Sequence, residues 1–195
     1  MRLFAALELP GEAVRALLEF RDAAADAALW RPVAAESLHV TLAFMGSRDA
    51  DDVDPAGGVL RTTMGEAAGG AGPGHQSAGG AGPRLALAGA LLLPPRRARV
   101  LCAALDDPDG TLAALRARVA GGLAQAGLYG PEARPFRPHV TVARLRSGAR
   151  APREIVTAPE PVRFAGTALT FFESRLHPSG ARYAALIRVP FAPLS

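Results

Sequence analysis

Two stretches of the chain, SLHVTLAF at residues 37–44 and RPHVTVAR at residues 137–144, repeat one pattern. Each contains His-Val-Thr followed by an aliphatic residue and alanine, and each comes after a helical pattern and a loop that contains proline. Both alternate in the manner of a β-strand, in which residues i and i+2 face the same side. We therefore expect each copy to present two polar side chains side by side: His39 with Thr41, and His139 with Thr141.

The rest of the chain predicts further strands and a few helices around these copies. Apolar runs bounded by glycine and proline predict strands at 2–9, 38–44, 84–93, around 100, 138–145, 162–176 and 181–190, with HPSG at 177–180 as a hairpin turn. Helical spacing predicts one helix that opens at Pro10 and Gly11 and is broken by WRP at 30–32, a second from the acidic segment 49–54 to about Met64, and a third that is capped by Asp109 and ends near Gly127. This combination indicates an α+β fold.

Residues 65–83, GEAAGGAGPGHQSAGGAGP, form a low-complexity segment dominated by glycine and alanine. Such a segment lacks the apolar surface needed for packing. We therefore expect a mobile loop inserted into one domain that spans residues 1–195.

Arginine supplies all 22 basic side chains, against 18 acidic ones, and the formal net charge is +4. Without lysine the chain cannot build a Walker-A site or a protein-kinase core, and it cannot use a Schiff base or a lysyl-adenylate intermediate. The single cysteine, Cys102, excludes a disulfide framework and a cysteine-based zinc site, and we expect it to be a small core residue. The chain shows neither a signal peptide nor an apolar run of membrane-spanning length, so we expect a cytoplasmic monomer with no membrane partner.

Two His-Thr pairs brought together across a cleft would supply two imidazoles and two hydroxyls. Histidine accepts or donates a proton near neutral pH, and a threonine hydroxyl can hydrogen-bond a phosphate oxygen. Two histidines on opposite sides of a phosphorus provide a base for the attacking water and an acid for the leaving oxygen. This chemistry requires no metal and no cofactor, and the sequence has no His-x-x-His motif or cysteine pair to hold a metal.

The chain resembles the 2H phosphoesterases, a superfamily named for a pair of His-x-Thr motifs, and within it the bacterial RNA 2′,3′-cyclic phosphodiesterases, also called 2′-5′ RNA ligases. The resemblance covers essentially the whole length. It is carried by MRLFAALELP at 1–10, WRPVAAESLHVTLAFMG at 30–46, RPFRPHVTVARL at 134–145 and LTFFESRLHPSGARYAAL at 169–186. The insertion at 65–83 departs from the usual length of the family.

The resemblance implies a bilobal fold with a pseudo-twofold axis, in which two antiparallel sheets face each other across a central cleft and the helices lie outside. It also implies metal-independent hydrolysis of a terminal ribose 2′,3′-cyclic phosphate to a 2′-phosphate at RNA 3′ ends, including tRNA halves, with weak ATP-independent 2′-5′ ligation as the reverse reaction. In that mapping His39 is the proton donor and His139 the proton acceptor. Thr41 and Thr141 hold the non-bridging oxygens, and Arg144 matches an arginine near the phosphate.

Strict strand alternation places Arg144 on the face opposite His139, so Arg144 can serve only if the strand bends or bulges. Phe44 could stack on a base, but core packing is the favoured interpretation. Trp30 and Phe136 are expected to be loop anchors rather than walls of the cleft. Of the remaining histidines, His177 is expected to be structural within the hairpin turn, and His75 is expected to have no role.

Two alternatives remain open at this point. A different branch of the superfamily could act on a small nucleotide such as ADP-ribose cyclic phosphate, and the shared motif does not separate that branch from one that acts on RNA. A module that binds RNA ends without turning them over is the other alternative. Binding alone does not need two titrating histidines, which argues against the second.

Overall fold

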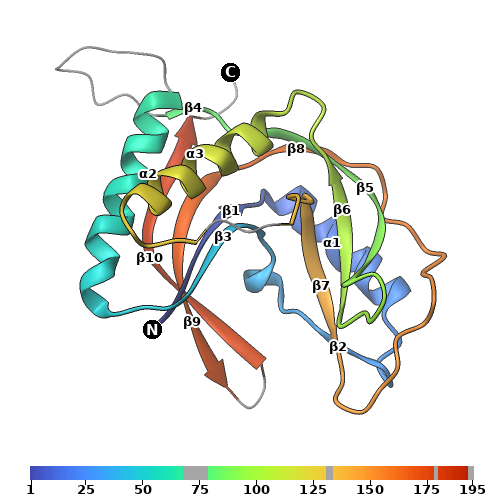
Figure 1. Cartoon of the computed structure of the whole chain (residues 1–195). Coiled ribbons are helices and arrows are strands. Elements are labelled where there is room, and N and C mark those ends of the chain that lie inside the picture. The colour runs from blue at the N-terminus through green and yellow to red at the C-terminus, as the bar shows by residue number, and fades with distance from the viewer. Residues whose placement is uncertain (68–78, 131–133, 178–179, 193–195) are drawn as a thin grey trace.

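Two five-stranded β-sheets form the framework of the computed structural model, which describes residues 1–67, 79–130, 134–177 and 180–192 (Figure 1). The strands are β1 (Arg2–Glu8), β2 (Trp30–Pro32), β3 (Val40–Ser47), β4 (Gly79–Ala81), β5 (Arg84–Leu93), β6 (Val100–Asp106), β7 (His139–Leu145), β8 (Arg163–Ala165), β9 (Ala168–His177) and β10 (Gly180–Ala192). The helices are α1 (Gly11–Ala24), α2 (Val53–Ala67) and α3 (Thr111–Gln125), and one-turn 3-10 helices precede β3 (Ala35–Ser37) and α2 (Ala50–Asp52). The first sheet has the order β3-β1-β9-β10-β4 and the second the order β2-β7-β6-β5-β8. The predicted α+β class is confirmed.

One strand-helix-strand unit occurs in each sheet. In the first, β1 leads through α1 to β3, and in the second, β6 leads through α3 to β7; in both units the two strands pair side by side and antiparallel. The second strand of each unit carries a His-Val-Thr motif. This internal repeat accounts for the two-lobed arrangement with approximate twofold symmetry.

The connecting helices cross from one sheet to the other. Helix α1 starts from β1 of the first sheet but packs against β7 and β8 of the second. Helix α3 starts from β6 of the second sheet, contacts β5 of that sheet, and packs against β3 of the first sheet and against α2. Apolar positions of α1 recur at i, i+3, i+4 and i+7, and this face is buried: Ala13, Ala16, Leu17 and Phe20.

The strand predicted at 162–176 is in fact two strands that belong to different sheets. Strand β8 pairs with β5, and β9 pairs with β1. At the crossing point the amide of Gly166 donates to Pro83 O (3.0 Å), whereas the next amide, that of Thr167, donates to Glu8 O (3.0 Å). A side chain at Gly166 would clash with Leu7, since an added Cβ would lie 2.5 Å from Leu7 Cδ1. The continuous apolar pattern contained no sign of this change of sheet.

The predicted cap of the third helix was also wrong. Asp107, not Asp109, accepts hydrogen bonds from the amides of Leu112 (3.1 Å) and Ala113 (2.9 Å) at the start of α3. Asp109 instead forms an ion pair with Arg84 at 3.1 Å. The N-cap residue of α3 is Gly110, so Asp109 lies one position before the cap, and its carboxylate accepts hydrogen bonds from Arg84 rather than from the helix amides.

Parts of the segment predicted as a loop at 65–83 form helix and strand. Helix α2 runs to Ala67, beyond the predicted end at Met64, and β4 occupies Gly79–Ala81. Residues 68–78, and with them His75, lie outside the described residues. Residues 178–179 of the predicted hairpin turn also lie outside them.

Residues 30–32, predicted only to break the first helix, form the short edge strand β2 beside β7. Trp30 is 1% exposed and belongs to the core, as a loop anchor should. None of the helices in the described ranges is long and apolar enough to cross a membrane.

Candidate active site

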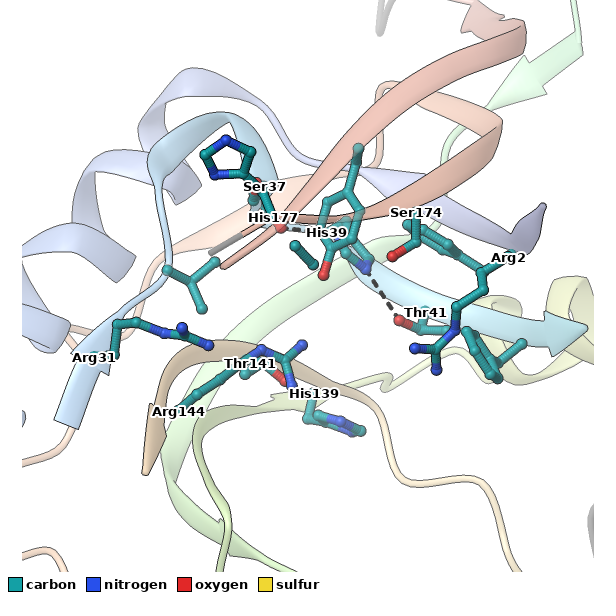
Figure 2. A pocket seen from close by; sticks show the side chains of 15 residues that line it. Arg2, Arg31, Ser37, His39, Thr41, His139, Thr141, Arg144, Ser174 and His177 are labelled. Atoms are coloured by element: carbon teal, nitrogen blue, oxygen red, sulfur yellow. Dashed lines mark hydrogen bonds between the residues drawn. The ribbon is translucent and has the colours of Figure 1, made fainter. Parts of the chain in front are cut away.

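The two lobes bring both His-Thr pairs to one pocket of about 430 Å³. Figure 2 shows His39 and Thr41 on one side of this pocket and His139 and Thr141 on the other. His39 lies one residue before β3, and His139 is the first residue of β7. The structure thus brings together the four side chains that the repeated motif singled out.

A β-bulge follows the threonine in both motif strands. On β3, Thr41 pairs with Ala6 and Ala43 with Ala5, so Leu42 is an extra residue. On β7, Thr141 pairs with Cys102 and Ala143 with Leu101, so Val142 is the extra residue. The same irregularity at the same place shows that the repeat extends to the backbone of the two strands.

The bulge on β7 turns Arg144 into the pocket. Arg144 pairs with Val100, and Val100 lies on the same face of β6 as Cys102, the partner of Thr141. Arg144 therefore shares the face of Thr141, and it lines the pocket (Figure 2). Strict alternation therefore assigned Arg144 to the wrong face. The strand is bulged, which was the condition for Arg144 to take part in the site.

Phe44 takes the corresponding position on β3. It pairs with Phe4, whose face is that of Ala6, the partner of Thr41. Phe44 lines the pocket and is 42% exposed, so the core-packing interpretation was wrong. The guanidinium of Arg2 lies over its ring, 5.3 Å from the ring centre.

Both histidines are held in the same way. Nδ1 of His39 donates to Ser37 O at 2.8 Å, and Nδ1 of His139 donates to Arg137 O at 2.7 Å. A carbonyl oxygen can only accept, so each Nδ1 carries a hydrogen, and Nε2 is the ring atom left to give or take a proton. Nε2 of His39 lies 3.1 Å from Thr41 Oγ1.

The surroundings of His39 keep it neutral. Its ring packs against Phe4 (4.9 Å between ring centres) and edge-on against Tyr183 (5.2 Å). Burial lowers the pKa of His39 to about 4; the hydrogen bond to Ser37 opposes this shift, while the charges of Arg144 and His139 add to it. In the unliganded pocket His39 therefore carries no charge at neutral pH.

Cys102 is a core residue, as predicted, and it also supports the site. Its Sγ lies 3.6 Å from the hydroxyl oxygen of Thr141, its cross-strand partner. Burial raises the pKa of the Cys102 thiol to about 11, although the contact with Thr141 and the charge of Arg144 oppose the shift. The thiol is therefore neutral and helps to orient the Thr141 hydroxyl.

Several other residues of the pocket were missed by sequence reasoning. Arg2, Arg31, Ser174 and Tyr183 line it. Alternation along β1 could have placed Arg2, since Arg2 stands two residues before Phe4 on the same face. His177, expected in the turn, is the last residue of β9 and lines the pocket. The lining contains three arginines and three histidines and no carboxylate, so the described part of the pocket favours an anion.

Phe136 does not belong to the lining of this pocket. It is half-buried, and the guanidinium of Arg116 lies 5.5 Å from the centre of its ring. Within the described ranges, no group of three or more His, Cys, Asp or Glu side chains is arranged to hold a metal ion.

Two lobes that each deliver a His-x-Thr pair to a shared pocket define a two-histidine phosphoesterase fold. The model of the 2′-5′ RNA ligase superfamily matches residues 9–178, and the chain belongs to this family. It is 30% identical over 190 residues to an RNA 2′,3′-cyclic phosphodiesterase of Escherichia coli strain K12, covering 96% of this chain and 94% of that protein. It is 32% identical over 198 residues to an RNA 2′,3′-cyclic phosphodiesterase of Thermus thermophilus, covering 95% of this chain and 88% of that protein.

Solved structures agree with this assignment. The crystal structure of TT0787 from Thermus thermophilus superposes with a TM-score of 0.78 at 25% identity, and the match covers 98% of both chains. The crystal structure of Escherichia coli LigT in complex with 3′-AMP superposes with a TM-score of 0.75 at 26% identity, again over 98% of both chains. The predicted family and the predicted bilobal fold are confirmed.

Proposed function

We propose that this protein hydrolyses the 2′,3′-cyclic phosphate at the 3′ end of RNA and leaves a 2′-phosphate. The observation that carries the proposal is the pair of histidines that are held through Nδ1, turn Nε2 to proton transfer, and reach from opposite lobes one pocket whose described lining contains no carboxylate. Its support from the comparisons is the name of two relatives, RNA 2′,3′-cyclic phosphodiesterase.

The reaction needs one proton acceptor and one proton donor. His139 Nε2 takes a proton from water while the water oxygen bonds to phosphorus. The P–O3′ bond breaks, and His39 Nε2 gives its proton to O3′, so that one proton is taken up and one released in each turnover. His139 then returns its proton to solvent and His39 regains one.

The remaining polar groups stabilise charge in the transition state. In this proposal the hydroxyls of Thr41 and Thr141 donate to the two non-bridging oxygens of the phosphate. The guanidinium of Arg144 neutralises the charge that develops as water adds to phosphorus. Because no step uses a metal ion, the reaction is metal-independent.

His39 becomes protonated when the substrate binds. In the empty pocket the pKa of His39 is about 4, too low for a proton donor at neutral pH. A bound phosphate places a negative charge beside Nε2 and favours the imidazolium form, which raises the pKa. Substrate binding and charging of the acid are therefore coupled.

The same step with a different nucleophile joins RNA ends. A 5′-hydroxyl attacks phosphorus in place of water, His139 takes the proton of that hydroxyl and His39 protonates O3′, which gives a 2′-5′ linkage without ATP. We propose this ligation as a weak side reaction, because water is present in large excess over RNA ends. The monomeric state and the cytoplasmic location stay predictions.

The test is hydrolysis of a short RNA that ends in a 2′,3′-cyclic phosphate, with the position of the phosphate in the product determined by chromatography against 2′- and 3′-phosphate standards. The proposal expects a 2′-phosphate. A 3′-phosphate product contradicts the assignment of the leaving oxygen. If the RNA binds but is not turned over, the site is a binding module; if only a small cyclic nucleotide such as ADP-ribose cyclic phosphate is hydrolysed, the RNA substrate is wrong.

A further inference from the structure

Two arginines face each other directly across the edge of the second sheet. Arg31 of β2 pairs with Arg144 of β7, and both line the pocket of the histidines. Like charges opposite each other on neighbouring strands destabilise a sheet. Within the described ranges neither guanidinium forms an ion pair with a carboxylate. An anion bound between or beside them would remove this repulsion.

The pocket continues past Arg31 into a second pocket of about 500 Å³. The two pockets share Arg31 and Arg144, and the second leads on to Arg182 of β10. Three arginines line it against one carboxylate, that of Glu36. Positive charge therefore extends from the site of the histidines along a path that has room for more than a phosphate group.

The second pocket adjoins the Arg31 end of the first. Figure 2 shows Arg31 on one side of the two histidines and Arg2 on the other. Phe44, under the guanidinium of Arg2, provides an aromatic wall on that second side. The two ends of the pocket thus differ: one has the Phe44 ring under Arg2, and the other opens into the second pocket, which we call the channel and which Arg31, Arg144 and Arg182 line.

We propose that Arg31, with Arg182 beyond it, binds the phosphodiester that links the terminal nucleoside to the nucleotide before it. In an RNA strand, the terminal ribose with the 2′,3′-cyclic phosphate is linked through its 5′ oxygen to a phosphodiester, which bears the next negative charge. With the cyclic phosphate between His39 and His139, that second charge enters the channel at Arg31. This inference rests on the proposed function, and it makes Arg31 a specificity residue for RNA strands over bare nucleosides.

Four substrates test the inference by changing only the 5′ group. They are a nucleoside 2′,3′-cyclic phosphate, the same compound with a 5′-phosphate, a dinucleotide with the cyclic phosphate at its 3′ end, and that dinucleotide with a neutral methylphosphonate linkage. Each is assayed with the wild-type protein and with the Arg31→Gln and Arg182→Gln variants. Arg15→Gln, which removes an exposed arginine of α1 outside both pockets, controls for net charge.

For Arg31→Gln we expect kcat/KM to fall about 10-fold more on the dinucleotide than on the nucleoside, the effect of losing one hydrogen bond to a charged group. Replacing the charged linkage with the neutral one should lower kcat/KM of the wild type by the same factor and leave kcat/KM of Arg31→Gln unchanged. Arg182→Gln should show a smaller loss with the same pattern. Arg15→Gln should match the wild type on all four substrates.

Other patterns overturn the inference. If Arg31→Gln lowers kcat/KM equally on all four substrates, Arg31 contacts the scissile phosphate. If it lowers kcat/KM on none of them, Arg31 does not bind substrate. The 5′-phosphorylated nucleoside is compared with the dinucleotide, each relative to the bare nucleoside. If both raise kcat/KM equally and Arg182→Gln has no effect, the site binds the lone 5′-phosphate of a small nucleotide rather than a strand. A wild-type protein inactive on every cyclic phosphate contradicts the proposed function itself, which is a separate result.

A measurement without turnover checks the same residue. Because Arg31→Gln removes the repulsion from Arg144, Tm in phosphate-free buffer should equal or exceed that of the wild type. A lower Tm would show that Arg31 stabilises the fold and would contradict the picture of two unpaired like charges.

Discussion

Phe44 and Arg144 occupy equivalent places in the two lobes: each follows its motif threonine by three residues, and each is turned into the shared pocket by a bulge just before it. One is aromatic and the other cationic. The symmetric backbone therefore ends in two unlike walls. The two walls differ in chemistry, although the guanidinium of Arg2 lies 5.3 Å from the centre of the Phe44 ring.

Arg144 is expected to matter for the rate rather than for folding. Replacing it with Gln should lower kcat about 100- to 1,000-fold, as is typical for the loss of a group that stabilises transition-state charge. Arg144→Lys, which keeps the charge but loses the forked geometry, should recover part of this loss. Steady-state kinetics on a cyclic-phosphate RNA measure both. A change confined to KM would show that Arg144 only binds substrate.

Each histidine is expected to be required for hydrolysis. His39→Ala and His139→Ala should each lower kcat by about 100- to 10,000-fold, the usual contribution of a general acid or base. Circular dichroism should show native secondary structure in both variants. Substantial activity in either one would contradict the two-histidine mechanism.

The lowered pKa of His39 makes stability depend on pH. Between the usual value of 6.5 and the folded value of about 4 the unfolded chain binds more protons than the folded one. The free energy of unfolding should therefore fall as the pH drops from 6.5 toward 4, and this part of the fall should vanish in His39→Asn. Denaturant titrations at several pH values provide the measurement, and parallel curves for the two proteins would contradict the assignment.

The pKa of His39 should rise when an anion binds beside the ring or when a neighbouring positive charge is removed. Inorganic phosphate in the pocket should raise the pKa of His39, and so should Arg144→Gln, since Arg144 is one of the charges that lower it. NMR titration of the ring protons follows the pKa, with His39→Asn used to assign the signal. A pKa that stays near 4 with saturating phosphate would remove His39 as the proton donor.

Cys102 is expected to support Thr141 without reacting itself. Cys102→Ala should lower kcat about fivefold, the equivalent of about 1 kcal/mol for one hydrogen bond. Cys102→Ser, which restores a polar partner for the Thr141 hydroxyl, should recover most of it. A thiol reagent should label the native protein only on unfolding, since the thiol is buried and its pKa is raised to about 11. Rapid labelling of the folded protein would contradict this placement.

Hydrolysis is expected to survive removal of metal ions. After extensive dialysis against EDTA, kcat/KM for a cyclic-phosphate RNA should equal that of the untreated protein. Loss of activity that a divalent ion restores would replace the two-histidine mechanism with metal catalysis.

The repeated motif was enough to place four of the pocket residues, because a repeat of side chains on strands predicts a repeat of backbone. It could not place Arg144 and Phe44. Leu42 and Val142 are ordinary aliphatic residues that fit a regular strand as well as a bulge, so alternation assigned the faces after them incorrectly. The bulge is set by pairing with β1 and β6, which a local pattern does not contain.

Three other differences have the same origin in contacts distant along the chain. Gly166 marks the change from one sheet to the other because of Leu7 and Pro83, neither of which is near it in sequence. Asp109 has the residue type of a helix cap, but the cap position belongs to Gly110 and the Asp109 carboxylate pairs with Arg84. The local pattern identifies Arg31 only as part of a helix break, and its importance is visible only in its register with Arg144.

The crossing of α1 and α3 has a consequence for how the molecule can be divided and how it can move. Helix α1 follows a strand of the first sheet but packs on the second, and α3 follows a strand of the second sheet but packs on the first. Neither half of the chain therefore contains all of its own packing partners. Cutting the chain between β5 and β6 should therefore yield two fragments that fold only when mixed. For the same reason, we expect the two imidazoles to keep their separation rather than to move apart about a hinge between the lobes.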